Sequence, residues 1–352
     1  MNPSAALPRY DIAESYDWNY LHAPEPAAID VPACPGAWDF CGIPIDSPIG
    51  IPAGPLLNSR WILYYASLGF SVLTYKTVRS SHRDCYDPPN LAPVEPHTLA
   101  GGGGDLRLAA PGAAVDSWAI SFGMPSKDPS VWREDVTRAR RGLRRGQVLS
   151  VSVVASPLPG WSLDEMAADF TRCARWAVEA GAEAVEANLS CPNVCSQEGQ
   201  IFTSPEASAR IASDMRAAIG RTPLILKIGL FDGREAAEAF AAAVRPYANA
   251  LSTVNSITAK ISGAGGAPLF GGLTRGIGGA AIRARSNAEA AMLHDAITAA
   301  GGGLQVIGVG GVFTAADVRE RLAAGARHVQ LATAAMLDPE CGVRIRRQLA
   351  ST

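Results

Sequence analysis

Eight short apolar runs, separated by longer stretches with helical periodicity, constrain the fold of this chain most strongly. They stand at 47–54, 70–77, 148–155, 184–191, 223–229, 250–257, 304–311 and 328–336. The runs are apolar on both faces, which is typical of buried parallel strands. Helix-start patterns lie between them, such as the capping box Ser162–Glu165 and the pair Ser204-Pro205. With 48% hydrophobic and 18% charged residues, the chain can bury a sizeable core.

This alternation predicts an α/β fold, a (β/α)8 TIM barrel. The alternative is a doubly wound sheet, but that fold usually carries GxGxxG after its first strand, and IPAGPLL does not match. We expect residues 1–46 to form an N-terminal extension packed on the barrel, and residues 47–352 to form the barrel. Two long gaps follow the second and sixth strands. They hold a glycine-rich insertion at 97–118, expected as a hairpin or loop, and a glycine-dense stretch at 263–279, both on the catalytic face.

Composition argues against several classes of partner. The net charge of −2 gives no basic field for nucleic acid, and the arginines between 138 and 145 fit a solvated helix face better than a phosphate patch. The chain shows no signal peptide and no apolar run of about 18 residues, so we expect no membrane span. Its seven cysteines form no CxxC pair, which predicts no metal site, no disulfide framework and a reducing cytoplasm.

In a barrel of this kind, the residues at the C-terminal ends of the strands face the active site. The candidates there are Ala53, Gly54, Lys76, Thr77, Asn188, Cys191, Asn193, Lys227, Asn255, Ser256, Gly310, Gly311, Ala332 and Thr333. The glycine pair after the seventh strand, with the end of the eighth, predicts a phosphate site built from backbone N–H groups. Gly278 and Gly279 are expected to add further donors.

The fourth run ends in a thiol between two amide side chains, in the stretch Asn188-Leu-Ser-Cys191-Pro-Asn193. A free thiol has a pKa of about 8.5, close enough to neutrality for Cys191 to act as a base. The amides offer donors and acceptors that suit an imide-like edge, such as that of a pyrimidine ring. A buried structural cysteine is the alternative for Cys191. A second thiol, Cys195, is either a bystander or an alternative proton carrier.

Two of the few lysines in this arginine-rich chain end apolar runs. Lys76 closes SVLTYK and Lys227 closes PLILK. Beside a flavin, a lysine stabilises negative charge at the pyrimidine end of the reduced ring. The alternative is that each lysine snorkels or forms an ion pair.

The chain carries, in chain order, the motifs LTYK, NLSCPN, LKIG, VNSI and GxGG. With these motifs it resembles the dihydroorotate dehydrogenase family over roughly residues 43–340. The resemblance implies a (β/α)8 barrel that holds FMN at its C-terminal face. A soluble class of the family has cysteine as catalytic base, and a membrane-associated class has serine. Cys191 therefore implies the soluble, cytoplasmic class, which is a homodimer and needs no membrane.

The same resemblance implies oxidation of dihydroorotate to orotate, a step of pyrimidine biosynthesis. Cys191 would remove a proton from C5 while a hydride passes from C6 to flavin N5. The pyrimidine ring would be held by Lys76, Asn188, Asn193, Asn255 and Ser256. The flavin contacts would come from Ala53, Gly54, Lys76, Thr77, Lys227, Asn255, Gly278, Gly279, Gly310, Gly311, Ala332 and Thr333.

One departure from the family pattern bears on the substrate. Where the family has a loop like N-S-M-G-L-P-N, whose first Asn helps to hold the substrate, this chain has Ile120-Ser-Phe-Gly-Met-Pro-Ser126. Ile120 cannot make that hydrogen bond. An FMN oxidoreductase acting on another small ring therefore stays open, as do a non-catalytic flavin-binding barrel and a phosphate-binding isomerase without flavin. The electron acceptor is unknown from the sequence.

Overall fold

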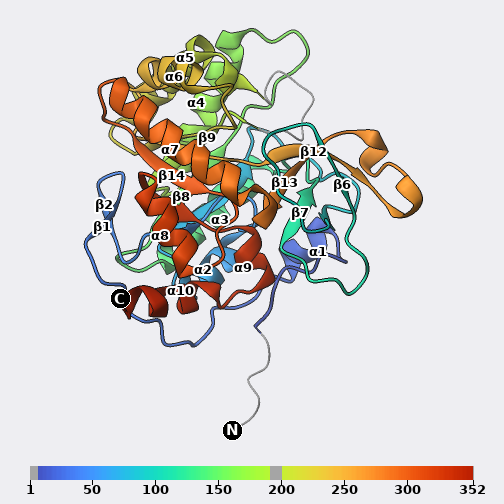
Figure 1. The fold of residues 1–352 in the computed structure, drawn as a ribbon. Coiled ribbons are helices and arrows are strands. Elements are labelled where there is room, and N and C mark those ends of the chain that lie inside the picture. Colours follow the sequence, from blue (N-terminus) through green and yellow to red (C-terminus); the bar gives the residue numbers. More distant parts are fainter. Residues whose placement is uncertain (1–6, 191–199, 352) are drawn as a thin grey trace.

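The computed structural model describes residues 7–190 and 200–351, and its centre is a closed barrel of eight parallel strands (Figure 1). These strands are β3 (Ile49–Ile51), β4 (Val72–Val78), β8 (Val148–Val153), β9 (Ala184–Asn188), β10 (Leu224–Lys227), β11 (Ala250–Thr253), β14 (Gln305–Val309) and β15 (Ala326–Gln330). The predicted TIM barrel is thus confirmed, and every predicted run overlaps a barrel strand. The last run, 328–336, was drawn too long, because helix α9 begins at Thr333.

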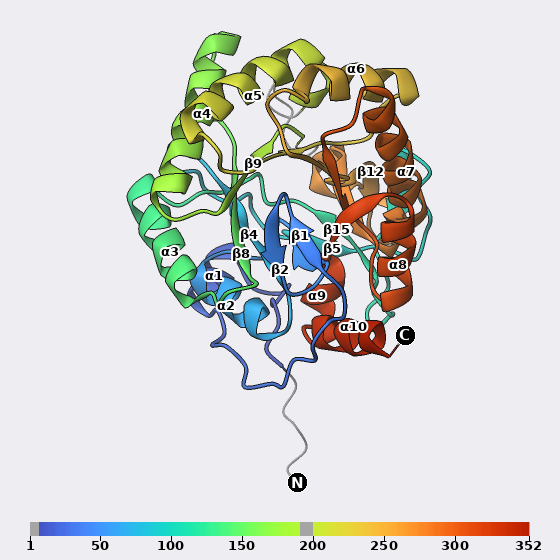
Figure 2. The same ribbon diagram turned by 90° about the vertical axis from the view of Figure 1, so that its left-hand side faces the viewer.

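Helices surround the barrel as a ring (Figure 2). They are α2 (Ser59–Ser67), α3 (Pro129–Gly142), α4 (Leu163–Glu179), α5 (Pro205–Ile219), α6 (Arg234–Val244), α7 (Arg283–Ala299), α8 (Ala315–Ala323), α9 (Thr333–Leu337) and α10 (Cys341–Ala350). The predicted capping box is present, since Ser162 and Glu165 exchange hydrogen bonds at the start of α4. Helix α5 starts at Pro205 after its N-cap Ser204. No helix within the described residues is long and apolar enough to cross a membrane.

A short hairpin closes the N-terminal end of the barrel. It consists of β1 (Trp38–Phe40) and β2 (Ile43–Ile45), which lie across the barrel in Figure 2. Phe40 and Ile45 pack against the lowest layer of inward-facing side chains, which includes Val72, Val148 and Ile225. Because this end is filled with apolar side chains, ligand access is left to the opposite, C-terminal end.

Strands from the two long gaps, some of them outside the predicted insertions, combine into one five-stranded sheet beside the C-terminal end of the barrel. Its order is β5 (Leu91–Pro93), β7 (Ser117–Ile120), β13 (Arg275–Gly279), β12 (Ile257–Ser262) and β6 (Gly104–Arg107). The stretch 97–118 is not a separate hairpin or loop as expected. Its strand β6 pairs with β12, which follows the barrel strand β11. An isolated hairpin is marginal in water, whereas this sheet buries Val94, Leu106 and Ile277 in a core of its own.

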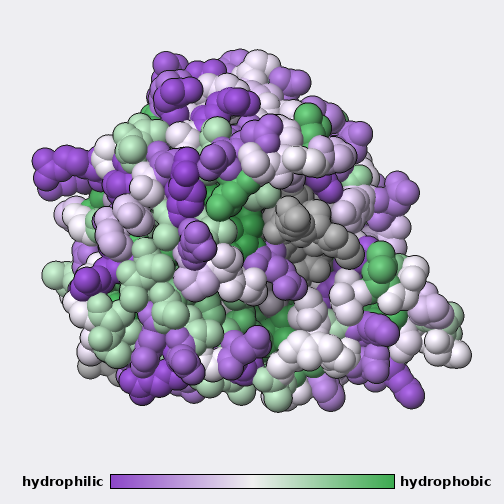
Figure 3. Space-filling view, turned by 90° about the horizontal axis from the view of Figure 1, so that it is seen from above, coloured by the Kyte–Doolittle hydropathy of each residue, from purple (hydrophilic) through white to green (hydrophobic). Residues whose placement is uncertain are grey.

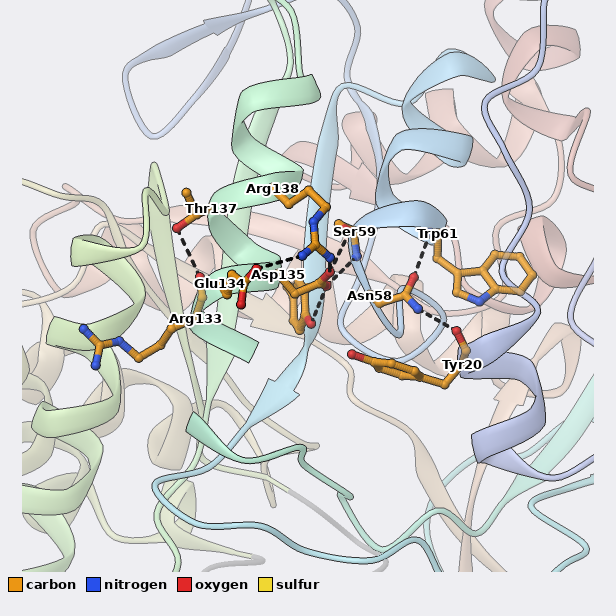
Figure 4. Close-up of polar contacts among 10 residues, drawn as sticks. Tyr20, Asn58, Ser59, Trp61, Arg133, Glu134, Asp135, Thr137 and Arg138 are labelled. Carbon is orange, nitrogen blue, oxygen red and sulfur yellow. Dashed lines mark hydrogen bonds and ion pairs between the residues drawn. The ribbon is translucent and has the colours of Figure 1, made fainter. Parts of the chain in front are cut away.

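The segment before the barrel is fixed to helix α2. Tyr64 donates from its hydroxyl to the Pro8 carbonyl at 2.6 Å, and Asn58 donates to the Tyr20 carbonyl at 2.7 Å (Figure 4). The indole of Trp61 donates to the Asn19 carbonyl at 3.0 Å. These bonds hold helix α1 (Tyr16–Leu21) and the residues before it against the barrel.

Surface charges are interspersed rather than gathered. The face over α4, α5 and α6 mixes hydrophilic with hydrophobic residues (Figure 3). The arginines around the end of α3 lie beside carboxylates: Arg138 pairs with Glu134, Arg140 with Glu183, and Arg144 with Asp46. These guanidinium groups therefore form ion pairs on a solvated face.

A buried carboxylate, Asp135 on α3, ties two helices to the barrel (Figure 4). It accepts from the backbone N–H and the hydroxyl of Ser59 on α2, both at 2.6 Å. The Tyr75 hydroxyl on β4 donates to it at 2.8 Å, and Arg138 pairs with it at 3.0 Å. A buried charge with this many donors is well compensated.

We predict that Asp135→Ala lowers the free energy of unfolding by about 3 kcal/mol, because it leaves the buried donors of Ser59 and Tyr75 without an acceptor. Urea unfolding measures this loss. The matched control is Glu134→Gln, the next residue, whose side chain is 76% exposed. Its loss is expected to stay within about 0.5 kcal/mol. Equal losses for both variants would show that the Asp135 network contributes nothing special.

Candidate active site

A cavity of about 950 Å³, counting its open mouth, lies at the C-terminal end of the barrel. The walls come from barrel strands, the inserted sheet and the N-terminal segment. The lining residues are Tyr10, Pro52, Ala53, Gly54, Pro55, Lys76, Thr77, Leu91, Trp118, Ile120, Phe122, Gly123, Met124, Asn188, Lys227, Asn255, Val309, Ala332, Thr333 and Met336.

Asn188, the last residue of β9, is the centre of the polar wall. Its amide nitrogen lies 3.4 Å from the Thr77 hydroxyl, which is 3.0 Å from the Ser152 hydroxyl. Its amide oxygen accepts from the Ser190 backbone N–H and from the Asn255 amide, each at 3.3 Å. Asn255 also donates to the Ser190 carbonyl. The two amides are thus held side by side, with their orientation fixed by the network.

Two buried ammonium groups face this cavity. Lys227 is 3% exposed and Lys76 is 7% exposed. The Lys227 ammonium lies 3.4 Å from the Ala53 carbonyl, and the Lys76 ammonium lies 4.6 Å from the centre of the Phe122 ring. Two ammonium groups beside one cavity make its potential positive, which favours a ligand that carries or develops negative charge.

The candidate glycines are tightly packed, one of them against the start of α9 and the others against neighbouring segments. A β-carbon on Gly278 would lie 3.3 Å from the Thr333 hydroxyl. Gly310 and Gly311 have positive φ, and a β-carbon on either would lie within 2.7 Å of a side-chain atom of Ser286 or Arg283. Gly279 instead packs against the Asp116 carbonyl, where a β-carbon would lie 2.1 Å away. At Gly279, Gly310 and Gly311 the positive φ and these close contacts together require glycine, although none of the three lines the cavity, whereas Gly278 is tightly packed without a positive φ.

The structure brings most of the candidates together. Ala53, Gly54, Lys76, Thr77, Asn188, Lys227, Asn255, Ala332 and Thr333 line one cavity. Ser256 does not join them, because it lines a second hollow with Ser190, Gln200 and Arg285. Gly278 adjoins Thr333. Cys191, Asn193 and Cys195 lie outside the described residues. Ile120 does line the cavity, so the apolar side chain lies at the site itself.

The sequence analysis missed the aromatic wall formed by Tyr10, Trp118 and Phe122 with Met336. The Tyr10 hydroxyl and the Trp118 indole N–H are buried and have no hydrogen-bond partner among the described residues. Burial, with smaller effects from Cys85 and Asp11, raises the pKa of the Tyr10 hydroxyl, so it remains a donor. The alternation in Ser-Trp-Ala-Ile pointed to Trp118, whereas nothing in the sequence around Tyr10 marked it.

We predict that Tyr10→Phe leaves the free energy of unfolding of the ligand-free protein unchanged or slightly higher, because its hydroxyl loses no partner. The matched control is Tyr64→Phe, whose hydroxyl donates to the Pro8 carbonyl and whose loss should cost about 1 kcal/mol. Chemical denaturation of both variants is the measurement. A loss for Tyr10→Phe as large as for Tyr64→Phe would mean that the Tyr10 hydroxyl is already bonded within the protein.

Comparison with known proteins connects this cavity to a family. A family model described as dihydroorotate dehydrogenase matches residues 134–352. The chain is 34% identical over 316 residues to the dihydroorotate dehydrogenase of Dictyostelium discoideum, covering 86% of this chain and 85% of that protein. It is 27% identical to the catalytic subunit of a dihydroorotate dehydrogenase B (NAD(+)) of Desulforudis audaxviator, over 88% of this chain and 90% of that one.

A solved structure agrees on the fold. The crystal structure of DHODH from Eimeria tenella in complex with ferulenol superimposes with a TM-score of 0.74 at 17% identity, covering 100% of this chain and 93% of that chain. At this identity the likeness concerns the barrel and its insertions only. Together with the sequence matches over most of the chain, it leads to one conclusion: this chain belongs to the dihydroorotate dehydrogenase family of oxidoreductases.

Proposed function

We propose that this protein is an FMN-dependent dehydrogenase that oxidises the CH–CH bond of dihydroorotate to give orotate, in the pyrimidine biosynthesis of the cytoplasm and as a homodimer. The observation that carries the proposal is the convergence of Lys76, Lys227, Asn188 and Asn255 in one cavity at the C-terminal end of the barrel. Two cations and two fixed amides match the anionic and imide-like edges of both a flavin and a dihydropyrimidine.

The described residues fit a flavin mononucleotide. Backbone N–H groups around Gly278, Gly310 and Gly311, with the Thr333 hydroxyl and Ala332, would hold the phosphate, and Gly279 would support that turn. Ala53 and Gly54 would pass beside the ring, with Thr77 and Asn255 at its polar edge. Lys76 and Lys227 would stabilise the negative charge of the reduced ring. When bound, the flavin supplies an acceptor for a hydride.

The substrate ring would be held by Lys76, Asn188, Asn193 and Asn255, with Ser256 at the edge of the neighbouring hollow. The Cys191 thiolate would take the proton from C5, and the electron pair of the C6–H bond would leave as a hydride to the flavin. The substrate thereby loses two electrons and two hydrogens and gains the C5–C6 double bond. Cys195 would be a bystander.

A second candidate is an oxidoreductase of the same architecture that acts on another dihydropyrimidine-like ring. The observation that favours it is Ile120, which lines the cavity where a hydrogen-bonding residue would hold the substrate. A non-catalytic flavin-binding barrel is a further alternative, and turnover of any ring substrate would exclude it. The electron acceptor is a separate question, because any oxidant that reoxidises the flavin would complete the catalytic cycle.

We predict that Cys191→Ala lowers the rate of orotate formation by about 10²–10⁴-fold while flavin stays bound, because it removes the general base. The assay supplies dihydroorotate and an artificial dye as electron acceptor, and orotate is measured directly. The matched control is Cys195→Ala, four residues along, which should keep most of the activity. A Cys191→Ala protein that turns over at the rate of the unmodified enzyme would contradict the assignment of the base.

We predict that Ile120→Asn raises kcat/KM for dihydroorotate by about tenfold, because it restores one hydrogen bond in a polar site. The volume control is Ile120→Leu, which keeps the site apolar and should give no gain. Steady-state kinetics of both variants against dihydroorotate and a dihydropyrimidine without the carboxylate measure the effect. No gain for Ile120→Asn with dihydroorotate would favour the second candidate, a differently shaped substrate.

A further inference from the structure

One layer of the barrel interior is entirely polar. Thr74, Glu186, Ser252 and Gln330 come from the alternate strands β4, β9, β11 and β15, each two residues beyond a member of the lowest layer. All four are buried. Side chains from alternate strands share a layer in such barrels, and those layers are usually filled by Val, Ile and Leu. A polar layer beneath the active-site cavity therefore needs a physical reason.

Three oxygen atoms of this layer find no hydrogen-bond partner among the described residues. They are Glu186 Oε1, Ser252 Oγ and Gln330 Oε1, and all three are buried. Gln330 donates to the Thr74 hydroxyl at 3.4 Å. Glu186 is only 2% exposed, so its carboxylate lies inside the barrel. Buried polar oxygens of this kind are normally bonded to ordered water or to a cationic side chain.

Lys227 places a cationic group above this layer, on the side of the active-site cavity. On the adjacent strands β9 and β10, Glu186 is opposite Ile225, and Lys227 is opposite Asn188. With a rise of about 3.3 Å per residue and about 4.8 Å between strands, the Cα atoms of Glu186 and Lys227 are roughly 8 Å apart. Both side chains face the barrel axis. The Lys227 ammonium has three donors, and the Ala53 carbonyl accepts one of them.

Among the described residues, the charged side chains of the barrel strands that face the interior sum to one positive charge. They are Lys76 and Lys227 at the cavity and Glu186 below it. His328, in the lower layer, is neutral at physiological pH, because burial lowers its pKa to about 3. A flavin ring that gains one negative charge on reduction would bring this sum to zero. Glu186 thereby limits how strongly the two lysines favour the reduced ring.

We propose that Glu186 is a positioning residue. Its carboxylate, linked by ordered water in the polar layer, holds the Lys227 ammonium in place and lowers the reduction potential of the flavin. The inference rests on the flavin site of the proposed function. It assigns a role to a carboxylate that touches neither the substrate nor the cofactor.

The test uses Glu186→Gln, which keeps the shape of the side chain and removes its charge. The flavin of the purified holoprotein is equilibrated anaerobically with a reference dye. We expect the ratio of reduced to oxidised flavin, at fixed dye ratio, to rise by about tenfold, which is a positive shift of about 30 mV for a two-electron couple. Ser252→Ala, an uncharged change in the same layer, should stay within twofold. Glu186→Asp, which keeps the charge, should do the same.

The outcomes separate this inference from the proposed function. A protein without bound flavin would overturn the proposed function. A yellow Glu186→Gln protein with an unshifted ratio, or a Ser252→Ala protein shifted as much, would overturn the role of Glu186 alone. If Glu186→Gln fails to fold, the role of Glu186 is tested in the unmodified protein. The measurement is the infrared difference spectrum between its reduced and oxidised states. An ionised carboxylate band that is perturbed on reduction and shifts in frequency in Glu186→Asp supports the proposal, and a protonated carboxyl overturns it.

Discussion

Closure of eight parallel strands into a barrel is the constraint on which the rest of the structure depends. Parallel pairing places every strand's C-terminal end at the same rim, so residues far apart in the chain meet there. Ala53, Asn188 and Thr333 line one cavity for this reason, although they belong to the beginning, middle and end of the barrel. The β1–β2 hairpin fills the opposite end with apolar side chains. The barrel therefore has a packed end and a polar end, and chemistry is confined to the second.

Buried charge gives the polar end its character. Lys76 and Lys227 are held in the interior, and the carboxyl group of Glu186 is buried one layer below. The amides of Asn188 and Asn255 are fixed against each other and add directional donors and acceptors. An environment of this kind costs folding free energy, which is the usual consequence of preorganising a site for charge that develops during a reaction.

The sequence predicted those features that depend on local periodicity. Lys76, Asn188 and Lys227 were found because each closes an apolar run, and the end of a parallel strand has one possible place in a barrel. Ser256 lies outside this cavity, because β11 ends at Thr253 and the chain then enters strand β12 of the inserted sheet. The pairing of β6 with β12 joins segments about 150 residues apart, which no local pattern encodes. Tyr10 enters the cavity through contacts of the N-terminal segment with α2, and these too are non-local. Glu186 was visible in the sequence, as a charged residue two positions before Asn188 on the same strand face.

The most direct measurement of the central claim follows the flavin without any electron acceptor. Dihydroorotate is added anaerobically to the purified yellow protein, and the visible absorbance is recorded in a stopped-flow instrument. The account predicts rapid bleaching, with one orotate formed for each flavin reduced. A flavin that stays oxidised in the presence of saturating dihydroorotate would contradict the claim that the cavity around Lys76, Asn188 and Lys227 oxidises this ring.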